Sequence, residues 1–587
     1  MISGIPVHRP GTVLLKEPSR AEPNRWLLFQ DPDDEIRTDT LADVQPALRR
    51  VQEAVGVGFW AAGFVTYEAA PAFDSALVTR APGKLPLLWF GLYRRVREIS
   101  EPELPAASFS HSTWTPSLQS AAFMGRIAEI KERIASGDTY QVNFTFRLDA
   151  AFDGDPAALL HMLVRSQDVP YAAYLSVNEF CICSGSPELF FEKRGSRITC
   201  RPMKGTAPRG VSLPDDHRQM RALHESVKDR AENVMIVDMI RNDLGRIARF
   251  GSVRVPRLFT VERYETLFQM TSTVTARTEA SLSDLFRALF PCASVTGAPK
   301  ASTMRIIAEL ETRPRGIYTG AIGYVAPRGD ARFSVAIRTM CADLSKHTVE
   351  YGIGSGIVWD SRAQGEYDEC LLKARVLLAP SPPFELLETM RLERHKGIFL
   401  RRRHVRRLCA SARYFGFAVD ATEIRRRLTE IERAYRSAPQ RVRLLLSRRG
   451  DVRIEVFPLS DEAARTPWRI ALATHPVDEQ NRFLYHKTTN RSVYDHALAE
   501  APACDDVILW NSRREIAEAT RANVVAKLNG IWVTPPVSCG LLAGTYRADL
   551  LSRKKIIEQR ITTDELLHAE QVCLINSVHK WIAVTWV

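Results

Sequence analysis

The stretch KDRAENVMIVDMIRNDLGR, residues 228–246, has a helical pattern in which Asp229 and Glu232 lie three positions apart. The segment EYDECLLKA, which begins at Glu366, repeats this spacing with Glu366 and Glu369. Residues three apart share one face of a helix, and like charges placed there repel. Two such faces brought together would form a carboxylate cluster suited to Mg²⁺, which prefers oxygen ligands.

Neighbouring residues favour a site for an anionic ligand. Taken alone, either acidic pair fits an exposed helix, with Glu369 and Lys373 as an ordinary ion pair. The glycine-rich run GIGSG at 352–356, however, would let backbone N–H groups approach an anion. Arg338, in the strand-like segment 334–339, is a candidate bidentate clamp for a carboxylate.

Length and composition limit the classes of protein that fit. The chain has 587 residues, more than one hydrophobic core usually supports, and its 45% hydrophobic and 25% charged residues are ordinary for a soluble protein. No stretch approaches a membrane span, and residues 1–12 lack the apolar core of a signal peptide, so we expect a cytoplasmic protein without membrane contact. The ten cysteines form neither a zinc pattern nor a disulfide framework.

The net charge of +12 comes from arginine-rich segments such as 401–407 and 425–427. Nucleic acid is the first partner that such a charge suggests. These segments have helical, amphipathic patterns without interleaved aromatic residues, and no nucleic-acid module is recognisable. We therefore expect a solvated basic face and no nucleic-acid partner.

A proline-rich segment divides the chain. LLAPSPP at 377–383 cannot continue a helix, so residues 379–383 are expected to be a linker between a domain at 1–378 and a domain at 384–587. Before it, strand-like runs alternate with long helical patterns, one of which extends from Met220 to Arg246. The first domain is predicted to mix helices and strands, and the second to be a smaller α/β domain.

Motifs across most of residues 120–376 resemble the chorismate-utilising enzymes, which include anthranilate synthase, isochorismate synthase and aminodeoxychorismate synthase component I. The resemblance implies an α+β fold with a large β-sandwich core and surrounding helices, and chorismate as the substrate. The motifs that carry it are GDTYQVNFT (137–145), SGSPELF (184–190), RPMKGT (201–206), KDRAENVMIVDMIRNDLGR (228–246), SVTGAPK (294–300), YTGAIGY (318–324), AIRT (336–339), GIGSGIVWDS (352–361) and EYDECLLKA (366–374).

The resemblance also implies roles for individual residues. Glu232 and Glu369 match the direct Mg²⁺ ligands, and Asp229 and Glu366 match acidic residues that act through water. The remaining matches are substrate-binding positions: Tyr318 and Arg338 at the enolpyruvyl carboxylate, the backbone of Gly354 and Gly356, Lys373 beside the metal-bound carboxylate, and Thr296.

Two positions in this family select the nucleophile. Relatives that add water have a lysine where this chain has Gln141, so ammonia is the expected nucleophile. Lys204 stands where aminodeoxychorismate synthases have lysine and anthranilate synthases usually have alanine. That lysine is thought to attack ring carbon C2, which requires a neutral amine. Gln269 departs from the histidine of many relatives, so an acid/base role at that position is not expected here.

A second set of motifs resembles the class IV pyridoxal-phosphate fold of branched-chain aminotransferases, D-amino-acid aminotransferases and aminodeoxychorismate lyase. It covers nearly all of residues 384–581 and implies pyridoxal 5'-phosphate as cofactor. The motifs are HVRRL (404–408), HKTTNRSVYD (486–495), EIAEATRANVV (515–525), TPPVSCGLLAGTYR (534–547) and LINSVH (574–579).

By that resemblance Lys487 is the catalytic lysine that carries the cofactor, and Glu518 bonds the pyridine nitrogen and keeps the ring protonated. The cofactor phosphate is expected at Arg407, the backbone N–H groups of Thr545 and Tyr546, and the hydroxyl of Ser577. Lyases and aminotransferases of this class share these residues, so the reaction stays open. Ala519 and the pair His579-Lys580 depart from related sequences and leave the substrate contacts undecided.

Together the two resemblances predict synthesis of 4-aminobenzoate from chorismate and ammonia, for folate synthesis, by a synthase joined to a lyase. No amidotransferase signature is present, so ammonia would come from free ammonium or from a separate glutamine amidotransferase subunit. A homodimer through the C-terminal domain is possible by analogy with class IV relatives. The enzymatic alternative is an anthranilate synthase-like domain fused to a class IV aminotransferase, and a non-catalytic docking partner is the alternative of another class.

Overall fold

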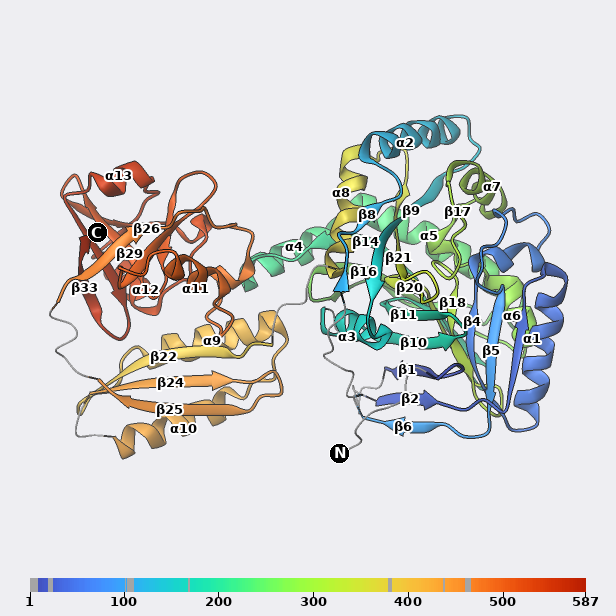
Figure 1. Ribbon diagram of the computed structural model, residues 1–587, viewed down its shortest axis with the longest axis horizontal. Helices are drawn as coiled ribbons and strands as arrows, with labels where there is room; N and C mark the ends of the chain where they lie inside the picture. Colours follow the sequence, from blue (N-terminus) through green and yellow to red (C-terminus); the bar gives the residue numbers. More distant parts are fainter. Residues whose placement is uncertain are drawn as a thin grey trace. The chain divides into compact units, whose positions relative to one another are not determined.

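The computed structural model describes residues 9–18, 25–100, 102, 110–166, 169–377, 383–435, 439–459 and 466–587. The chain forms two compact units (Figure 1). The first unit is Met1–Pro208 with Met220–Ser381, and the second is Arg209–Gln219 with Pro382–Val587. Except for Pro383, the predicted linker at 379–383 lies outside the described residues, as does most of the N-terminal segment 1–12.

Two large sheets form the centre of the first unit, each built mainly from antiparallel neighbours. In order across the first sheet, the strands are β17 (Gly297–Ala298), β9 (Gln141–Asp153), β21 (Thr348–Ile357), β20 (Thr339–Asp343), β11 (Phe180–Ser186), β10 (Tyr171–Val177), β1 (Val13–Glu17), β2 (Arg25–Phe29) and β6 (Arg97–Ile99), with β7 (Ser110–His111) and β8 (Thr115–Pro116) paired to β9. The second sheet has the order β14 (Met203–Pro208), β16 (Leu267–Arg277), β13 (Arg197–Arg201), β12 (Leu189–Arg194), β19 (Ala331–Val335), β18 (Ala321–Val325), β4 (Trp60–Val65), β5 (Leu88–Tyr93) and β3 (Asp34–Thr38), with β15 (Arg254–Arg263) paired to β16.

The two sheets pack against each other through one apolar layer, and helices cover their other faces. The shared layer includes Phe29 and Ile182 from the first sheet and Phe64 and Trp89 from the second. The helices of this unit are α1 (Leu41–Gly56), α2 (Ser120–Ala135), α3 (Pro156–Ser166), α5 (Val227–Gly245), α6 (Leu282–Leu289), α7 (Lys300–Leu310) and α8 (Ala363–Ala374), and α4 (Leu213–Glu225) begins in the second unit. This arrangement confirms the predicted β-sandwich core with surrounding helices.

The prediction of one continuous helix from Met220 to Arg246 is wrong, because two helices, α4 and α5, share this stretch. Ser226 adopts an extended backbone conformation and its hydroxyl accepts a hydrogen bond from the N–H of Asp229. This N-cap satisfies a backbone donor that has no partner within the helix. Asp229 therefore lies in the first turn of α5, and Glu232 follows one turn later.

The second unit contains a four-stranded and an eight-stranded sheet. The strand order of the smaller sheet is β23 (Gly397–Ile398), β22 (Leu386–Glu393), β24 (Gln440–Leu446) and β25 (Val452–Pro458), and helices α9 (Arg401–Phe415) and α10 (Ala421–Ala434) pack on it. The larger sheet has the order β28 (Ile516–Ala519), β27 (Asp506–Trp510), β26 (Trp468–Leu472), β33 (Lys580–Trp586), β32 (Gln571–Asn576), β29 (Asn523–Leu528), β30 (Ile531–Thr534) and β31 (Ile557–Glu558), with helices α11 (Ser492–Ala499), α12 (Thr545–Ser552) and α13 (Thr563–Leu567).

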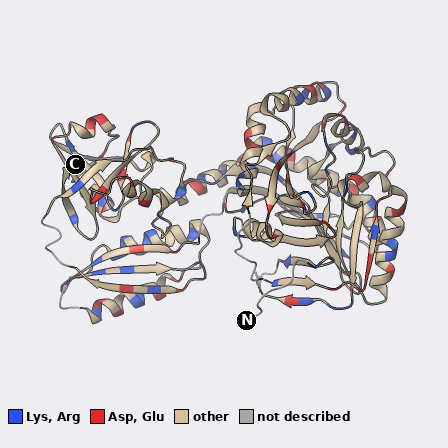
Figure 2. Cartoon of the chain, viewed as in Figure 1, with Lys and Arg blue, Asp and Glu red and all other residues tan. Residues whose placement is uncertain are grey.

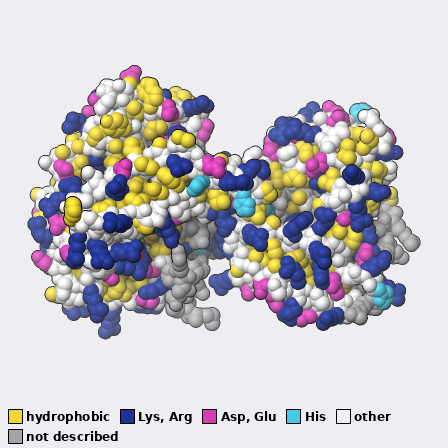
Figure 3. Space-filling view, turned by 180° about the vertical axis from the view of Figure 1, so that it is seen from behind, with side chains coloured by type: hydrophobic (Ala, Val, Ile, Leu, Met, Phe, Trp, Pro, Cys, Tyr) yellow, Lys and Arg dark blue, Asp and Glu magenta, His cyan; other side chains and the backbone are white. Residues whose placement is uncertain are grey.

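Acidic side chains accompany the arginine-rich helices. On α10, Arg426 forms ion pairs with Glu423 and Glu430 of the same helix, and the ribbon of this helix has both blue and red segments in Figure 2. On the face of the molecule drawn in Figure 3, basic side chains are interspersed with acidic and apolar ones. Such mixed surfaces are typical of solvated helix faces.

Candidate active sites

One cavity of the first unit, of about 130 Å³, brings together most of the residues predicted for chorismate and Mg²⁺. Its walls come from strands β14 and β21 and from helices α5 and α8. The predicted residues that line it are Lys204, Asp229, Glu232, Tyr318, Arg338, Gly354, Gly356, Glu366, Glu369 and Lys373. Thr296 does not line the cavity, and its hydroxyl instead donates to the carbonyls of Cys292 and Ala293.

The glycines of strand β21 are required by close packing. A Cβ at Gly356 would lie 2.6 Å from the Nζ of Lys204 and 3.0 Å from the Nε2 of Gln141, and a Cβ at Gly352 would overlap the ring of Tyr318. A side chain at position 352 would displace the Tyr318 ring, and one at position 356 would push the ends of Lys204 and Gln141 out of place. The glycine-rich run therefore lets Lys204 and Tyr318 pack directly against the strand.

The four predicted metal carboxylates face this cavity with different partners. Glu366 is buried and accepts hydrogen bonds from the hydroxyls of Ser355 and Ser361, while Lys228 lies 3.9 Å from Glu232 and 4.0 Å from Glu366. Burial raises the pKa of Glu232, and the carboxylates of Asp229 and Glu366 add to the increase. A cation in the cavity would relieve this repulsion.

Glu369 and Lys373 form an ion pair with an O–N distance of 2.7 Å, as the simpler interpretation of the sequence predicted. Both residues, however, line the cavity. Burial acts to raise the pKa of Glu369, but the ammonium groups of Lys373, Lys204 and Lys228 together outweigh it, so the pKa is lowered. The described residues include no group of three or more His, Cys, Asp or Glu side chains arranged to hold a metal ion. Mg²⁺ commonly takes one or two carboxylates and completes its shell with water and substrate, so the oxygen donors of Glu232 and Glu369 fit it.

Lys204 is only 9% exposed, and burial lowers the pKa of its ammonium group. The nearby Glu232 carboxylate opposes this decrease, whereas the Lys373 ammonium adds to it. Beside Lys204, both amide atoms of the buried Gln141 side chain lack a hydrogen-bond partner within the described part of the chain. The site therefore holds a lysine whose ammonium form is disfavoured by burial, next to a buried amide without a hydrogen-bond partner in the described part of the chain.

Glu188 is a site residue that the sequence analysis missed, although it lies inside the quoted motif SGSPELF. Its buried carboxylate lines the cavity and accepts a hydrogen bond of 2.6 Å from the Ser294 hydroxyl. Burial raises the pKa of Glu188 to about 7, although the Ser294 hydroxyl and the Lys204 ammonium act to lower it. A carboxyl with such a pKa can give or take a proton near neutral pH.

Arg338 has a left-handed backbone conformation, with φ of 51°, and the residue after Tyr318, Thr319, has φ of 64°. Non-glycine residues in this conformation store strain and concentrate at functional sites. The guanidinium of Arg338 donates to the Oε1 of Gln269 at 3.3 Å. Gln269, which departs from the histidine of many relatives, thus helps to orient the proposed carboxylate clamp.

A second cavity, of about 390 Å³, lies within the second unit. It is lined by all the predicted cofactor residues, which are Arg407, Lys487, Glu518, Thr545, Tyr546 and Ser577. Burial, followed by the nearby Arg407 guanidinium, lowers the pKa of Lys487 to about 8. The cavity thus combines a lysine that is readily deprotonated with a buried acid.

Residues around this cavity fit the two ends of pyridoxal phosphate. Burial raises the pKa of Glu518 to about 8, and its carboxylate accepts hydrogen bonds from the Tyr494 hydroxyl at 2.8 Å and from the Asn523 amide at 3.2 Å. A buried acid is the partner that a protonated pyridine nitrogen requires. Thr545 and Tyr546 begin α12, whose first N–H groups can bind a phosphate.

Glu388, which the sequence analysis did not single out, organises the predicted phosphate site. Its buried carboxylate accepts two hydrogen bonds from Arg407, at 2.9 and 2.7 Å, and lies 2.6 Å from the Nδ1 of His404. The opposite nitrogen of His404 lies 3.2 Å from the hydroxyl of Thr545. Burial opposes its ionisation, but Arg407 and His404 lower the pKa of Glu388 to about 2, so this carboxylate stays ionised.

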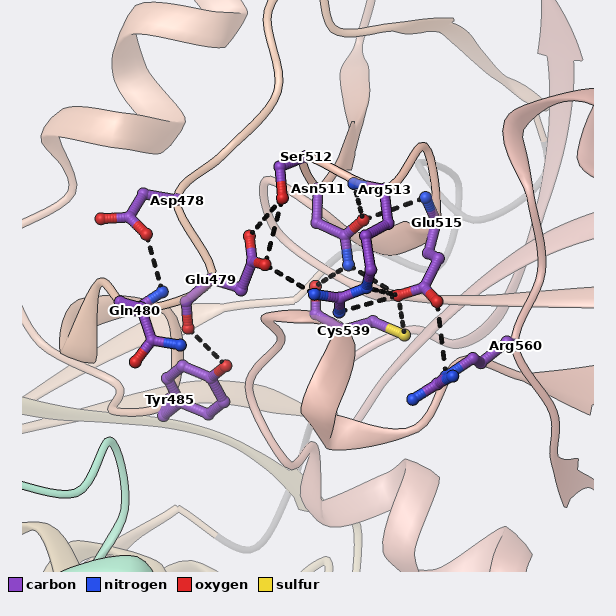
Figure 4. Close-up of polar contacts among 10 residues, drawn as sticks. All are labelled: Asp478, Glu479, Gln480, Tyr485, Asn511, Ser512, Arg513, Glu515, Cys539 and Arg560. Carbon is purple, nitrogen blue, oxygen red and sulfur yellow. Dashed lines mark hydrogen bonds and ion pairs between the residues drawn. The ribbon is translucent and has the colours of Figure 1, made fainter.

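The loop that leads to Lys487 is fixed by polar contacts (Figure 4). Glu479 accepts hydrogen bonds from the Ser512 hydroxyl at 3.1 Å and from Arg513 at 2.7 Å, while Arg513 also donates to Glu515 at 2.9 Å. The hydroxyl of Tyr485 donates to the backbone carbonyl of Glu479 at 2.7 Å. These contacts join the loop to the turn between β27 and β28.

Comparison with known families agrees with the two sites. Residues 15–379 match the family of chorismate binding enzymes, and residues 385–587 match the class IV amino-transferases. The chain belongs to the chorismate binding enzymes and carries a class IV aminotransferase domain in its last third. Both resemblances predicted from sequence are confirmed.

Individual relatives match the first unit. Aminodeoxychorismate synthase component 1 of Salmonella typhimurium is 40% identical over 271 residues, which cover 46% of this chain and 59% of that protein. Anthranilate synthase component 1 of Methanothermobacter thermautotrophicus is 34% identical, with coverage of 54% and 73%. The crystal structure of anthranilate synthase component I from Streptococcus pneumoniae aligns with a TM-score of 0.52 and 26% identity, covering 60% of this chain and 91% of that one.

The chain thus spans about three fifths of the Salmonella relative. Helices able to span a membrane are not found among the residues that the structure describes.

Proposed function

We propose that this chain converts chorismate and ammonia into 4-amino-4-deoxychorismate and water in its first unit, and that compound into 4-aminobenzoate and pyruvate in its second. The observation that carries the proposal is that each unit has a cavity lined by a lysine of lowered pKa, Lys204 in one and Lys487 in the other. Apart from Thr296, the predicted ligand residues line the same cavity as the lysine of their unit. Domain limits at 1–378 and 384–587 remain part of this proposal.

In the first unit, the proposed roles divide between binding and covalent chemistry. Arg338 and Tyr318 would hold one substrate carboxylate, while Glu232 and Glu369 would hold Mg²⁺ for the other. The amine of Lys204 attacks ring carbon C2 as the C4 hydroxyl leaves, and ammonia then adds at C4 as the lysine departs. Glu188, which lines the same cavity, would supply the proton that lets the hydroxyl leave as water.

In the second unit, pyridoxal phosphate would supply an electron sink that stabilises negative charge at the carbon losing a proton. Arg407, Thr545, Tyr546 and Ser577 would hold its phosphate, and Glu518 would face its ring nitrogen. Lys487, as a neutral amine, would remove the C4 proton of the substrate. Loss of that proton lets the ring become aromatic and pyruvate leave.

Two partners belong to the proposal. The relatives named component 1 are consistent with ammonia delivered by a separate glutamine amidotransferase subunit. Dimerisation through residues 384–587 stays a prediction by analogy with class IV proteins. The alternative of anthranilate synthase joined to an aminotransferase also has relatives among the matches, and Lys204 is the residue that argues against it.

Product analysis tests the whole proposal. The purified protein, given chorismate, ammonium, Mg²⁺ and pyridoxal phosphate, is expected to release 4-aminobenzoate and pyruvate in equal amounts, measured by chromatography. Anthranilate as the main product would favour the alternative. Failure to consume chorismate at all would support a non-catalytic role.

Removal of Mg²⁺ is expected to stop the first reaction only. Treatment with EDTA, Glu232→Gln or Glu369→Gln should lower chorismate consumption by more than about 10²-fold, since losing a metal ligand in a charged site costs several kcal/mol. The lyase reaction, measured with supplied aminodeoxychorismate, should persist. Asp238→Asn is a matched control, because Asp238 is an exposed acid on the same helix paired with Arg241. Full synthase activity in EDTA contradicts the metal assignment.

A further inference from the structure

Residues 209–219 belong to the second unit, although they lie inside the stretch that matches the chorismate binding family. They follow directly after β14, the strand that carries Lys204, and include the start of α4. Leu213, at the start of that helix, packs against the core formed by β22, α9 and α10. The second unit therefore includes a segment from outside its own family match.

A buried ion pair shapes this segment. The Nε of Arg209 lies 2.9 and 3.0 Å from the two carboxylate oxygens of Asp216, and their side chains are 8% and 3% exposed. The backbone N–H of Gly210 donates to the same carboxylate at 2.9 Å. Buried pairs persist when further hydrogen bonds satisfy both charges, as they do here.

Tyr414, at the end of α9, connects the segment to the wall of the cofactor cavity. Its hydroxyl donates to the carbonyl of Gly210 at 2.7 Å, its carbonyl accepts from Arg209 at 2.8 Å, and the Arg209 guanidinium lies 4.6 Å from its ring centre. The His486 imidazole stacks against the same ring, with centroids 4.2 Å apart and an angle of 25°. Arg209, Tyr414 and His486 thus form a continuous stack.

His486 directly precedes Lys487, and several groups hold it. The Ser411 hydroxyl lies 2.8 Å from its Nδ1, and Phe415 packs edge-on against its ring. Burial lowers the pKa of His486 to about 3, so the imidazole stays neutral in this apolar stack. The backbone carbonyl of Lys487 accepts from Leu387 at 2.9 Å.

We propose that residues 209–219 are a functional part of the second active site and position Lys487 through the stack of Arg209, Tyr414 and His486. The inference rests on the proposed role of Lys487. Because His486 and Lys487 are adjacent, movement of the imidazole shifts the backbone from which the lysine amine projects. A segment next to Lys204 in the chain thereby supports the second reaction.

The full-length variant Tyr414→Leu tests this proposal. Leucine retains an apolar side chain and removes both ring contacts and the hydroxyl. We expect weaker pyridoxal-phosphate binding, measured by absorbance titration, and a lyase kcat lowered by roughly tenfold, since small misplacements of reacting groups have effects of this size or larger. Phe417→Leu is the matched control, because Phe417 lies in the same core and contacts Phe384. Equal effects of the two variants overturn the proposal.

Two further measurements separate positioning from general loss of stability. Tyr414→Phe keeps the stack and loses only the hydroxyl, so it should restore most of the lyase kcat. Hydrogen exchange of the Gly210 and Asp216 amides should rise in Tyr414→Leu together with residues of the second unit, while helix α5 stays protected. If the hydrogen exchange of these two amides changes together with that of helix α5 instead, the proposal is overturned. If Lys487→Ala retains lyase activity, the proposed function fails, whichever result Tyr414 gives.

Discussion

Replacement of Lys487 by alanine is expected to stop formation of 4-aminobenzoate and make aminodeoxychorismate accumulate from chorismate and ammonium. In the proposed reaction the lysine amine takes the substrate proton, and loss of a general base lowers rates by about 10²- to 10⁴-fold. The visible absorption of the lysine-linked cofactor should also disappear. Product chromatography and an absorption spectrum measure the two effects.

The matched control for this variant is Lys527→Ala. Lys527 lies in the same unit, on β29, and its partly exposed side chain pairs with Glu570 outside the cavity. It should retain both the absorption band and the wild-type product ratio. If Lys487→Ala still makes 4-aminobenzoate at the wild-type rate, the second unit does not use this lysine and the lyase proposal is wrong.

Local patterns predicted the parts of both sites that depend on short sequence distances. The acidic pairs lie on helix faces because spacing alone places Asp229 with Glu232 and Glu366 with Glu369. The break at Ser226 was missed because a serine inside a helical pattern is also compatible with a continuous helix. The β-sandwich core followed from the family resemblance, since periodicity does not specify which strands pair.

The contacts missed from sequence all join residues far apart in the chain. Glu188 acquires its raised pKa from burial beside Ser294, and Glu388 acquires its lowered pKa from Arg407 and His404 on a helix. No local pattern states which charges will meet after folding. The inclusion of residues 209–219 in the second unit could not be predicted from local sequence either. The chain passes from one unit to the other in more than one place, and the proline-rich segment near 380 marks only one of them.

Lys204→Ala is expected to lose C4 amination by several orders of magnitude. If the amine of Lys204 occupies C2 of the ring, ammonia is directed to C4, whereas ammonia that attacks C2 itself leads toward anthranilate. Removing the nucleophile of a covalent mechanism removes the whole pathway, and the effect on rate exceeds the loss of one contact. Chromatography with ammonium as donor should show little 4-aminobenzoate and any residual 2-amino product. Supplied aminodeoxychorismate should still be converted, which controls for folding.

Lys204→Arg separates covalent chemistry from simple attraction of a dianionic substrate. Arginine keeps the positive charge, but its guanidinium stays protonated and cannot act as a nucleophile. The structure favours the covalent role, because burial lowers the pKa of Lys204 and so favours the neutral amine that attack requires, whereas a residue kept only for its charge gains nothing from this shift. The variant should therefore be as inactive as Lys204→Ala, and mass spectrometry of wild-type protein should find a chorismate-derived adduct on residues 201–206. Near-wild-type 4-aminobenzoate from Lys204→Arg would defeat the covalent mechanism while leaving the overall reaction in place.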